Sequence, residues 1–364
     1  MKITIQNPQY ECHNPEKTLH PYNWYILNKY TKNIFIYNLD FNGYKILIIW
    51  IIKNKINIFK FKWIFSIKTL NKHSDILISF NWRPDYDFLC PPLDYKWLKF
   101  VHIMDYFVYT KNAYNNLVKN EIDYVLWYNN HWIYDDYFKS IYKNYINKCI
   151  SVPFSFANRF KNINNFKSRI NKCVALWAVN FINDNNVINW ELDDAKEYFN
   201  KKNEVYFHKF RNMLVENEEL LSNEIDSLLI NNWKNWNYNI VDKYNEYKMF
   251  TTCESIMNFP SVKTYEWMAC WSVFVASDNP CYDEIWLIDW INCIKYKQYD
   301  IIDFKNKVIY YQNNPELLEQ ISINWYNHVI KNYNPEKTAL DLFNIMKEIH
   351  EKWNINFNTN TNIQ

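Results

Sequence analysis

Residues 255–278 read Ser-Ile-Met-Asn-Phe-Pro-Ser-Val-Lys-Thr-Tyr-Glu-Trp-Met-Ala-Cys-Trp-Ser-Val-Phe-Val-Ala-Ser-Asp. A Pro-Ser pair followed by mixed polar and apolar residues predicts a helix over 260–270, and the apolar run after it predicts a buried strand over 272–277. Four polar residues lie in the first turn of this helix or just after it: Ser261, Lys263, Thr264 and Glu266. Free backbone N–H groups at a helix amino terminus attract anions, and a nearby lysine strengthens that attraction. The stretch therefore predicts an anion-binding helix.

On either side of this stretch, short apolar runs alternate with helix-length segments. In the amino-terminal half, apolar runs predict buried parallel strands at 44–52, 75–80, 98–104, 122–126 and 149–152, with helices at 109–120 and 133–147. In the other half, the predicted strands are 172–176, 204–207, 247–252, 272–277 and 290–296, and the predicted helices are 191–201, 212–229 and 260–270. Two closing helices are predicted at 315–332 and 335–352. Alternation of this kind predicts two α/β domains.

The 364 residues are enough for two domains that each bury their own core. A polar connection at 153–171 separates the two halves. The sequence therefore predicts an amino-terminal Rossmann-like domain over 1–160 and a carboxy-terminal Rossmann-like domain, with the closing helices, over 161–353. Residues 354–364 are rich in Asn and Thr and predict a disordered tail.

Charge and cysteine usage exclude several classes of partner. The 41 Lys and Arg residues nearly balance the 39 Asp and Glu residues, so we expect no nucleic-acid partner. The longest apolar run, 46–52, is too short to cross a bilayer, and the first residues contain no leader pattern. We expect a cytoplasmic protein without a transmembrane segment, which leaves a peripheral membrane contact open. Eight cysteines without a CxxC pair predict reduced thiols and no metal site.

The glycine content is anomalous. Gly43 is the only glycine, whereas an average domain of this length has about 25. The sequence has 17 tryptophans, and several stand where a turn would favour glycine, as in Asn-Trp-Lys-Asn-Trp-Asn at 232–237 and in Asp289-Trp290. Our hypothesis is that the gene comes from a lineage that reads UGA as glycine and was translated with UGA as tryptophan. The alternative is a genuinely aromatic-rich protein.

The stretch at 255–278 resembles the donor-binding segment of GT-B glycosyltransferases, and in particular of the group-one family. That family typically has Pro-Ser-x-x-x-x-Glu-x-Met-Ala-Cys-Gly-x-Pro-Val-x-Ala-Ser, which matches best if Trp271 stands for glycine. Residues 283–293, Asp-Glu-Ile-Trp-Leu-Ile-Asp-Trp-Ile-Asn-Cys, are similar to its Glu-(Leu/Ile)-Gly-x-x-Asp-Gly-x-Asn run. The resemblance implies two Rossmann-like domains that face a central cleft. Residues 1–160 would bind the acceptor and 161–353 the nucleotide sugar.

The same resemblance implies a hexosyltransferase that moves a sugar from a nucleotide-diphosphate donor to a hydroxyl of a carbohydrate or glycolipid, as in polysaccharide biosynthesis. Glu266 would accept hydrogen bonds from the ribose hydroxyls, and Lys263 would contact the phosphates. The helix amides and a cation can stabilise the departing diphosphate without metal, so we expect no cofactor besides the donor itself. The remaining expected donor-binding residues are Ser255, Asn258, Ser261, Thr264 and Arg211.

Two other functions stay open. The family usually has a second glutamate eight residues before Glu266, but Asn258 stands there, so retention or inversion of the anomeric configuration is undecided. Residues 247–255, Tyr-Lys-Met-Phe-Thr-Thr-Cys-Glu-Ser, are similar to a run in fucosyltransferases, which are inverting GT-B enzymes. A sugar-nucleotide-binding protein without turnover is the alternative outside enzymes.

An inverting enzyme needs a general base for the acceptor hydroxyl. His102, Asp105 and His131 follow or end predicted strands, where α/β sheets place ligands. Asp105 is the preferred catalytic candidate, and His131 is the second. Asp85-Tyr-Asp87 has the form of the DxD metal-binding signature of the other glycosyltransferase fold, GT-A.

Overall fold

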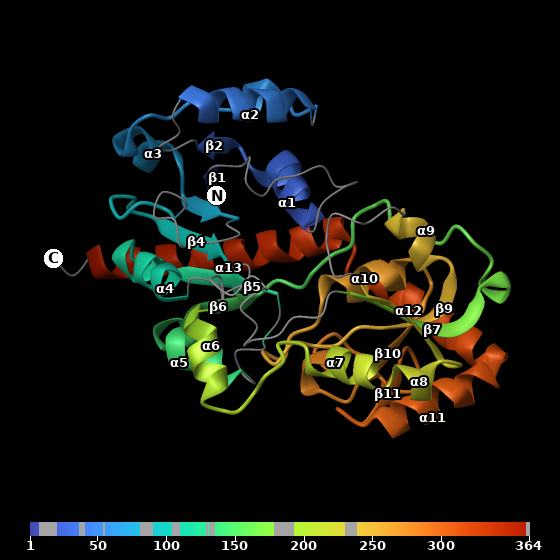
Figure 1. Ribbon diagram of the computed structural model, residues 1–364. Helices are drawn as coiled ribbons and strands as arrows, with labels where there is room; N and C mark the ends of the chain where they lie inside the picture. Colours follow the sequence, from blue (N-terminus) through green and yellow to red (C-terminus); the bar gives the residue numbers. More distant parts are fainter. Residues whose placement is uncertain are drawn as a thin grey trace. The chain divides into compact units, whose positions relative to one another are not determined.

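The computed structural model describes residues 1–6, 20–35, 41–53, 55–80, 90–103, 110–128, 130, 135–177, 193–229 and 239–361 (Figure 1). Contacts divide the chain into two compact units. Unit 1 consists of Met1–Tyr128, Phe138–Pro153 and Pro335–Gln364, and unit 2 consists of Asn129–Tyr137 and Phe154–Asn334. The last helix therefore groups with unit 1, whereas the sequence analysis placed residues 335–353 with the second domain.

Unit 1 contains a six-stranded sheet in the order β2-β1-β3-β4-β5-β6. The strands are β1 (Ile3–Gln6), β2 (Asn33–Phe35), β3 (Ile76–Ser79), β4 (Leu98–His102), β5 (Tyr124–Trp127) and β6 (Cys149–Ser151). Every neighbouring pair is parallel. β1, β3 and β4 are buried along their whole length, as expected for a parallel sheet covered on both faces.

The helices of unit 1 lie between these strands in the chain, except α13, which follows unit 2. They are α1 (Pro21–Tyr25), the π-helix η2 (Ile26–Tyr30), α2 (Phe41–Lys53), the 3-10 helix η3 (Ile58–Lys60), α3 (Ile67–His73), α4 (Thr110–Lys119), α5 (Asp136–Ile141), the 3-10 helix η6 (Lys143–Lys148) and α13 (Pro335–Thr361). α13 packs against α1 and η2, where the rings of Tyr30 and Phe343 stack with their centroids 4.4 Å apart. Among the described residues, no helix combines the length and apolar character that crossing a bilayer requires.

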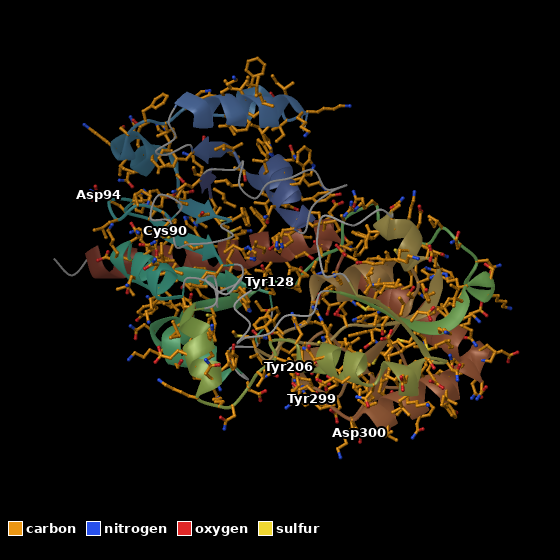
Figure 2. The ribbon with its side chains drawn as sticks, viewed as in Figure 1. Cys90, Asp94, Tyr128, Tyr206, Tyr299 and Asp300 are labelled. Atoms are coloured by element: carbon orange, nitrogen blue, oxygen red, sulfur yellow. The ribbon has the colours of Figure 1, made fainter. Side chains whose placement is uncertain are left out.

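Unit 2 contains a five-stranded parallel sheet in the order β11-β10-β9-β7-β8. Its strands are β7 (Ile170–Trp177), β8 (Ile225–Leu229), β9 (Tyr247–Thr251), β10 (Val273–Ser277) and β11 (Ile294–Tyr296). Its helices are α6 (Asp193–Asn200), α7 (Lys209–Glu216), α8 (Glu218–Leu221), α9 (Ile240–Tyr244), α10 (Val262–Ala269), α11 (Ile301–Gln312) and α12 (Pro315–Asn332), with 3-10 turns η7 (Phe166–Ser168) and η10 (Pro280–Tyr282). Asp300, labelled in Figure 2, caps α11 by accepting from two backbone N–H groups. The predicted α/β class is confirmed in both units.

Four predicted elements differ from the observed ones. Residues 44–52 form helix α2 instead of a strand, because a run of apolar residues has no periodicity that separates the two. The predicted helix over 212–229 ends at Glu216, and its last residues, from Ile225, form β8 and pair with β7. Residues 204–207, predicted as a strand, belong to neither sheet. The predicted helix over 133–147 is divided into α5 and η6 in the part that the structure describes.

The other predicted elements overlap observed ones. Predicted strands 75–80, 98–104, 122–126, 149–152, 172–176, 247–252, 272–277 and 290–296 correspond to β3, β4, β5, β6, β7, β9, β10 and β11. Predicted helices 109–120, 191–201, 260–270, 315–332 and 335–352 correspond to α4, α6, α10, α12 and α13. The sequence analysis did not predict β1 and β2, because these two short strands mix polar and apolar residues and form no long apolar run.

Candidate functional site

Helix α10 begins at Val262, two residues after the predicted start at 260. Ser261 is its N-cap, and the Ser261 Oγ accepts a hydrogen bond from the Lys263 backbone N–H at 3.3 Å. This bond satisfies one of the free N–H groups of the first turn and fixes the direction in which the helix starts. Thr264 and Glu266 follow on the same helix and are buried. The local sequence therefore places a lysine and a carboxylate one turn apart.

The Lys263 side chain extends toward the sheet of unit 2. Its Nζ donates to the Leu176 carbonyl at 3.3 Å, and Leu176 lies next to the last residue of β7. Ligands of open α/β sheets bind beyond the carboxyl ends of the strands, so the Lys263 ammonium lies where such a ligand would be. Burial, together with the positive charge of Arg211, lowers the pKa of Lys263 to about 8, while the charge of Glu266 acts in the opposite direction.

Arg211 is the second cation of this cluster. It lies on α7, is 7% exposed and hydrogen-bonds Cys253, directly before Glu254 in the chain. Burial lowers the pKa of Arg211. His208, the N-cap of α7, has a pKa well below its usual range because it is buried and faces the charges of Arg211 and Lys263. The positive charge of Arg211 thus lowers the proton affinity of both Lys263 and His208, and an anion bound beside these groups would relieve that repulsion.

Glu266 lies one helical turn after Lys263. Its side chain is 7% exposed and accepts a hydrogen bond from the Tyr244 hydroxyl at 3.3 Å. Burial raises the pKa of Glu266 to about 7, while the charges of Lys263 and Arg159 act in the opposite direction. The carboxylate is thus held close to a cation and is only partly compensated by hydrogen bonds, which suits a group that binds hydroxyls of a ligand.

Ser255 and Asn258 lie in the turn between β9 and α10. The Ser255 Oγ accepts from the Met257 backbone N–H at 3.2 Å, and the Asn258 Oδ1 accepts from the Asn279 side chain at 2.9 Å. Asn258 has a positive φ of 54°, which asparagine tolerates better than most residues. Both side chains hold the turn in shape, and their predicted contacts with a donor stay predictions.

Glu254 is a buried carboxylate that the sequence analysis quoted without assigning a role. It follows β9 and accepts hydrogen bonds from the Ser277 hydroxyl at 2.9 Å and the Gln298 amide at 2.6 Å. Burial raises the pKa of Glu254, and these hydrogen bonds act against that rise. Its position shortly after a buried strand, which ends at Thr251, was the signal available in the sequence.

The other candidates are placed less favourably or lie outside the described residues. Asp105 and His131 are outside the described ranges, as are Asp85 and Asp87. His102 ends β4 and is fully buried, with its Nε2 3.1 Å from the Tyr22 hydroxyl. Its ring also contacts that of Tyr128, which Figure 2 labels, in an edge-on arrangement with centroids 5.4 Å apart. Burial lowers the pKa of His102 to about 3, so this imidazole is neutral at physiological pH.

Two further observations concern the alternatives. Tyr247 and Lys248 of the fucosyltransferase-like run begin β9, at the end of the strand opposite to Glu254. The Tyr247 hydroxyl donates to Asp226 at 3.0 Å, which gives this tyrosine a structural role. Within the described ranges, no group of three or more His, Cys, Asp or Glu side chains is arranged to hold a metal ion.

Three tryptophans have the backbone conformation of glycine. φ is 68° at Trp271, 59° at Trp286 and 67° at Trp290, a region that costs a bulky residue about 1–2 kcal/mol. After α10, the N–H of Trp271 bonds the Met268 carbonyl and that of Ser272 bonds the Trp267 carbonyl. This is the Schellman motif, in which the position of Trp271 is usually glycine. The bonds of Trp286 and Leu287 to Asp283 and Tyr282 repeat the pattern.

Burial separates Trp286 and Trp290 from other tryptophans of the chain, whereas Trp271 is half-buried. Trp286 is 67% exposed and Trp290 is 48% exposed, so their indoles add little to the core. Trp267, in contrast, is buried between the rings of Tyr244 and Phe250, with centroids 3.9 Å and 4.9 Å away. Trp127 and Trp325 are also fully buried. Our hypothesis from the sequence also places glycine at Trp177, which is the last residue of β7.

We therefore expect UGA codons at Trp177, Trp271, Trp286 and Trp290, and UGG codons at the buried Trp127, Trp267 and Trp325. Peptide mass spectrometry of protein from the native host should find glycine at the first four positions. In protein made as written, Trp271→Gly should raise thermal stability and tighten nucleotide binding, because the C′ residue of α10 then adopts its conformation without strain. Tryptophan in host peptides covering 271, 286 and 290 would refute the hypothesis.

Comparisons with known proteins agree with the fold. No protein-family model matches the chain, and no curated protein sequence matches it. Among solved structures, Anabaena Alr3699/HepE in complex with UDP superposes with a TM-score of 0.53 at 11% identity, covering 96% of this chain and 100% of that one. The same protein in complex with UDP-glucose gives 0.51 at 10% identity, with the same coverage. A glycosyltransferase from Rickettsia africae gives 0.50 at 13% identity, covering 96% and 98%. With the two parallel α/β units, this likeness shows the GT-B fold.

Proposed function

We propose that this chain is a glycosyltransferase that moves a hexose from a nucleotide-diphosphate donor to a hydroxyl of a carbohydrate or glycolipid acceptor. The observation that carries the proposal is the cluster of Lys263, Arg211 and Glu266 at the start of α10, beside the carboxyl end of β7. Two cations and a carboxylate in this place match a ligand with a diphosphate and a ribose. The GT-B fold shared with proteins that bind UDP and UDP-glucose supports the same conclusion.

The chemistry of such a transfer needs little from the protein besides charge and position. As the bond between sugar and phosphate breaks, negative charge accumulates on the departing diphosphate. The ammonium of Lys263, the guanidinium of Arg211 and the free N–H groups at the start of α10 stabilise that charge. Glu266 holds the ribose hydroxyls, so the diphosphate keeps its place against the cations. If the reaction inverts the anomeric configuration, it also needs a general base for the acceptor hydroxyl, for which Asp105 and then His131 are the candidates from the sequence.

Transfer and donor hydrolysis test this function. Purified protein incubated with UDP-, GDP- and ADP-sugars should release the nucleoside diphosphate from one of them, faster when an acceptor saccharide or glycolipid is added. A protein that binds a nucleoside diphosphate but gives neither transfer nor hydrolysis would be a binding protein instead. Analysis of the anomeric configuration of the product separates a retaining enzyme from the fucosyltransferase-like, inverting alternative.

We expect the reaction to proceed at an unchanged rate in excess EDTA, because Lys263, Arg211 and the helix amino terminus supply the charge that a divalent cation would otherwise provide. The measurement is the initial rate of donor hydrolysis before and after chelation, with added Mg²⁺ and Mn²⁺ as controls. Loss of activity in EDTA that Mn²⁺ restores would contradict the expectation and favour a metal site at Asp85 and Asp87.

A further inference from the structure

In unit 1, large apolar side chains are exposed on α2 and in the segment between α2 and α3. Ile49 of α2 is 54% exposed, Ile52 is 69% exposed, and Phe59 of η3 is 89% exposed. Ile48, Ile58 and Phe65 are also exposed. We call these six side chains and the lysines among them the apolar-basic surface. The ring of Phe61, the residue after η3, contacts that of Trp50 of α2 with centroids 6.5 Å apart, so η3 lies beside α2. Exposed apolar side chains on adjacent elements of a protein surface mark a site of interaction with a protein or a membrane.

The apolar side chains of α2 divide into two faces. Leu47 and Ile51, one turn apart, are buried in the core of unit 1. Ile48, Ile49 and Ile52 lie on the other side of the helix and are exposed, with Lys45 and Lys53 exposed beside them. In Figure 1, α2 lies at the edge of unit 1 next to β2, which is the last strand of the sheet on that side. The exposed face of α2 is therefore available to a partner.

The charge on this surface has one sign. Residues 41–65, which carry this surface, contain no Asp or Glu, and their exposed lysines are Lys45, Lys53, Lys55 and Lys62. The whole chain carries a formal charge of only +2, so this concentration is local. Lysines that surround exposed isoleucine and phenylalanine side chains are the composition of a segment that lies in the interface of an anionic bilayer.

We propose that the apolar-basic surface binds the surface of an anionic lipid bilayer, with the isoleucine and phenylalanine side chains in the interface and the lysines against the lipid headgroups. A second copy of the chain is a poorer occupant, because a two-fold contact would bring the same lysines face to face without any carboxylate from this segment between them. The proposal does not depend on the donor site, which lies in unit 2. Binding to the bilayer gives the enzyme access to acceptors that are themselves anchored in a membrane.

Vesicle sedimentation tests the proposal with the full chain. Wild-type protein should bind vesicles of phosphatidylcholine and phosphatidylglycerol, and should bind pure phosphatidylcholine much more weakly, with binding reduced by high salt. Ile49→Ser/Ile52→Ser and Lys53→Glu/Lys55→Glu should each weaken binding to the mixed vesicles by about tenfold or more. All four side chains are exposed, so circular dichroism and melting temperature should stay unchanged.

Matched controls come from exposed residues of unit 2. Ile288→Ser/Ile291→Ser removes two isoleucines of similar exposure, and Lys161→Glu/Lys167→Glu makes the same change in charge; both should bind vesicles like wild type. Equal binding to neutral and anionic vesicles, or equal loss in the control variants, would overturn the proposal. So would a dimer, detected by light scattering, that Ile49→Ser/Ile52→Ser converts to monomer, because the occupant would then be a second copy. Donor hydrolysis in solution reports separately on the proposed function.

Discussion

Replacing Lys263 with methionine is expected to lower the affinity for a nucleoside diphosphate by about 10- to 100-fold, which corresponds to the loss of a hydrogen bond between charged groups. Methionine keeps most of the length of the side chain, so packing around α10 is preserved. The ammonium lies beside the end of β7 and is affected by the charge of Arg211. Because burial keeps water and counterions away from this position, they cannot easily replace the lost charge. Calorimetric titration measures the affinity.

The position of the lysine is tested by comparing two ligands and two variants. Lys263→Met should weaken binding of the nucleoside diphosphate strongly and binding of the corresponding nucleoside little, since the nucleoside has no phosphate. Lys248→Met is a matched control, because Lys248 is also a buried lysine of unit 2 but lies at the beginning of β9. Equal losses in both variants, or equal losses for both ligands, would show that Lys263 does not contact the phosphates.

Glu266→Ala should lower the affinity for the nucleoside diphosphate by at least about tenfold, because charge-assisted hydrogen bonds to two ribose hydroxyls contribute about 1.5–3 kcal/mol each in favourable geometry. Here the nucleoside should lose affinity as well, since it carries the same ribose. Glu266→Gln keeps one acceptor oxygen and should fall between wild type and alanine. The fold should survive, since burial already disfavours the charged form of this carboxyl.

Asn258→Ala is the comparison for Glu266, since we expect Asn258 to contact only the sugar of the donor. It should leave the affinity for the nucleoside diphosphate nearly unchanged, provided that loss of its hydrogen bond to Asn279 does not disturb the turn. The melting temperature reports on the turn. An unchanged affinity in Glu266→Ala would mean that the ribose does not bind at α10.

The part of unit 2 around α10 could be predicted because its elements have clear local signals. The N-cap serine and the lysine and glutamate one turn apart identify α10 and its polar groups without any tertiary information. The apolar run at 44–52 had no such signal. Only the contrast between buried Leu47 and exposed Ile49 reveals a helix there, and that contrast depends on the rest of unit 1.

It was harder to predict which residues come together at the site than to predict where in the chain the site lies. Arg211 was a candidate cation, but nothing in the sequence places it near Lys263; the pairing depends on how α7 and α10 lie on the sheet. His208 was missed because a histidine before a helix has many structural uses. The positive φ at Trp271, Trp286 and Trp290 supports the hypothesis that some tryptophan positions are glycine in the native protein, since glycine adopts this conformation without strain.

A crystal structure of the protein with a bound nucleoside diphosphate tests the central claim most directly. We predict electron density for the diphosphate at the start of α10, within hydrogen-bond distance of the Lys263 Nζ and the Arg211 guanidinium, with the ribose hydroxyls on the Glu266 carboxylate. A diphosphate bound away from these three side chains, or held by a metal ion at Asp85 and Asp87, would contradict the account.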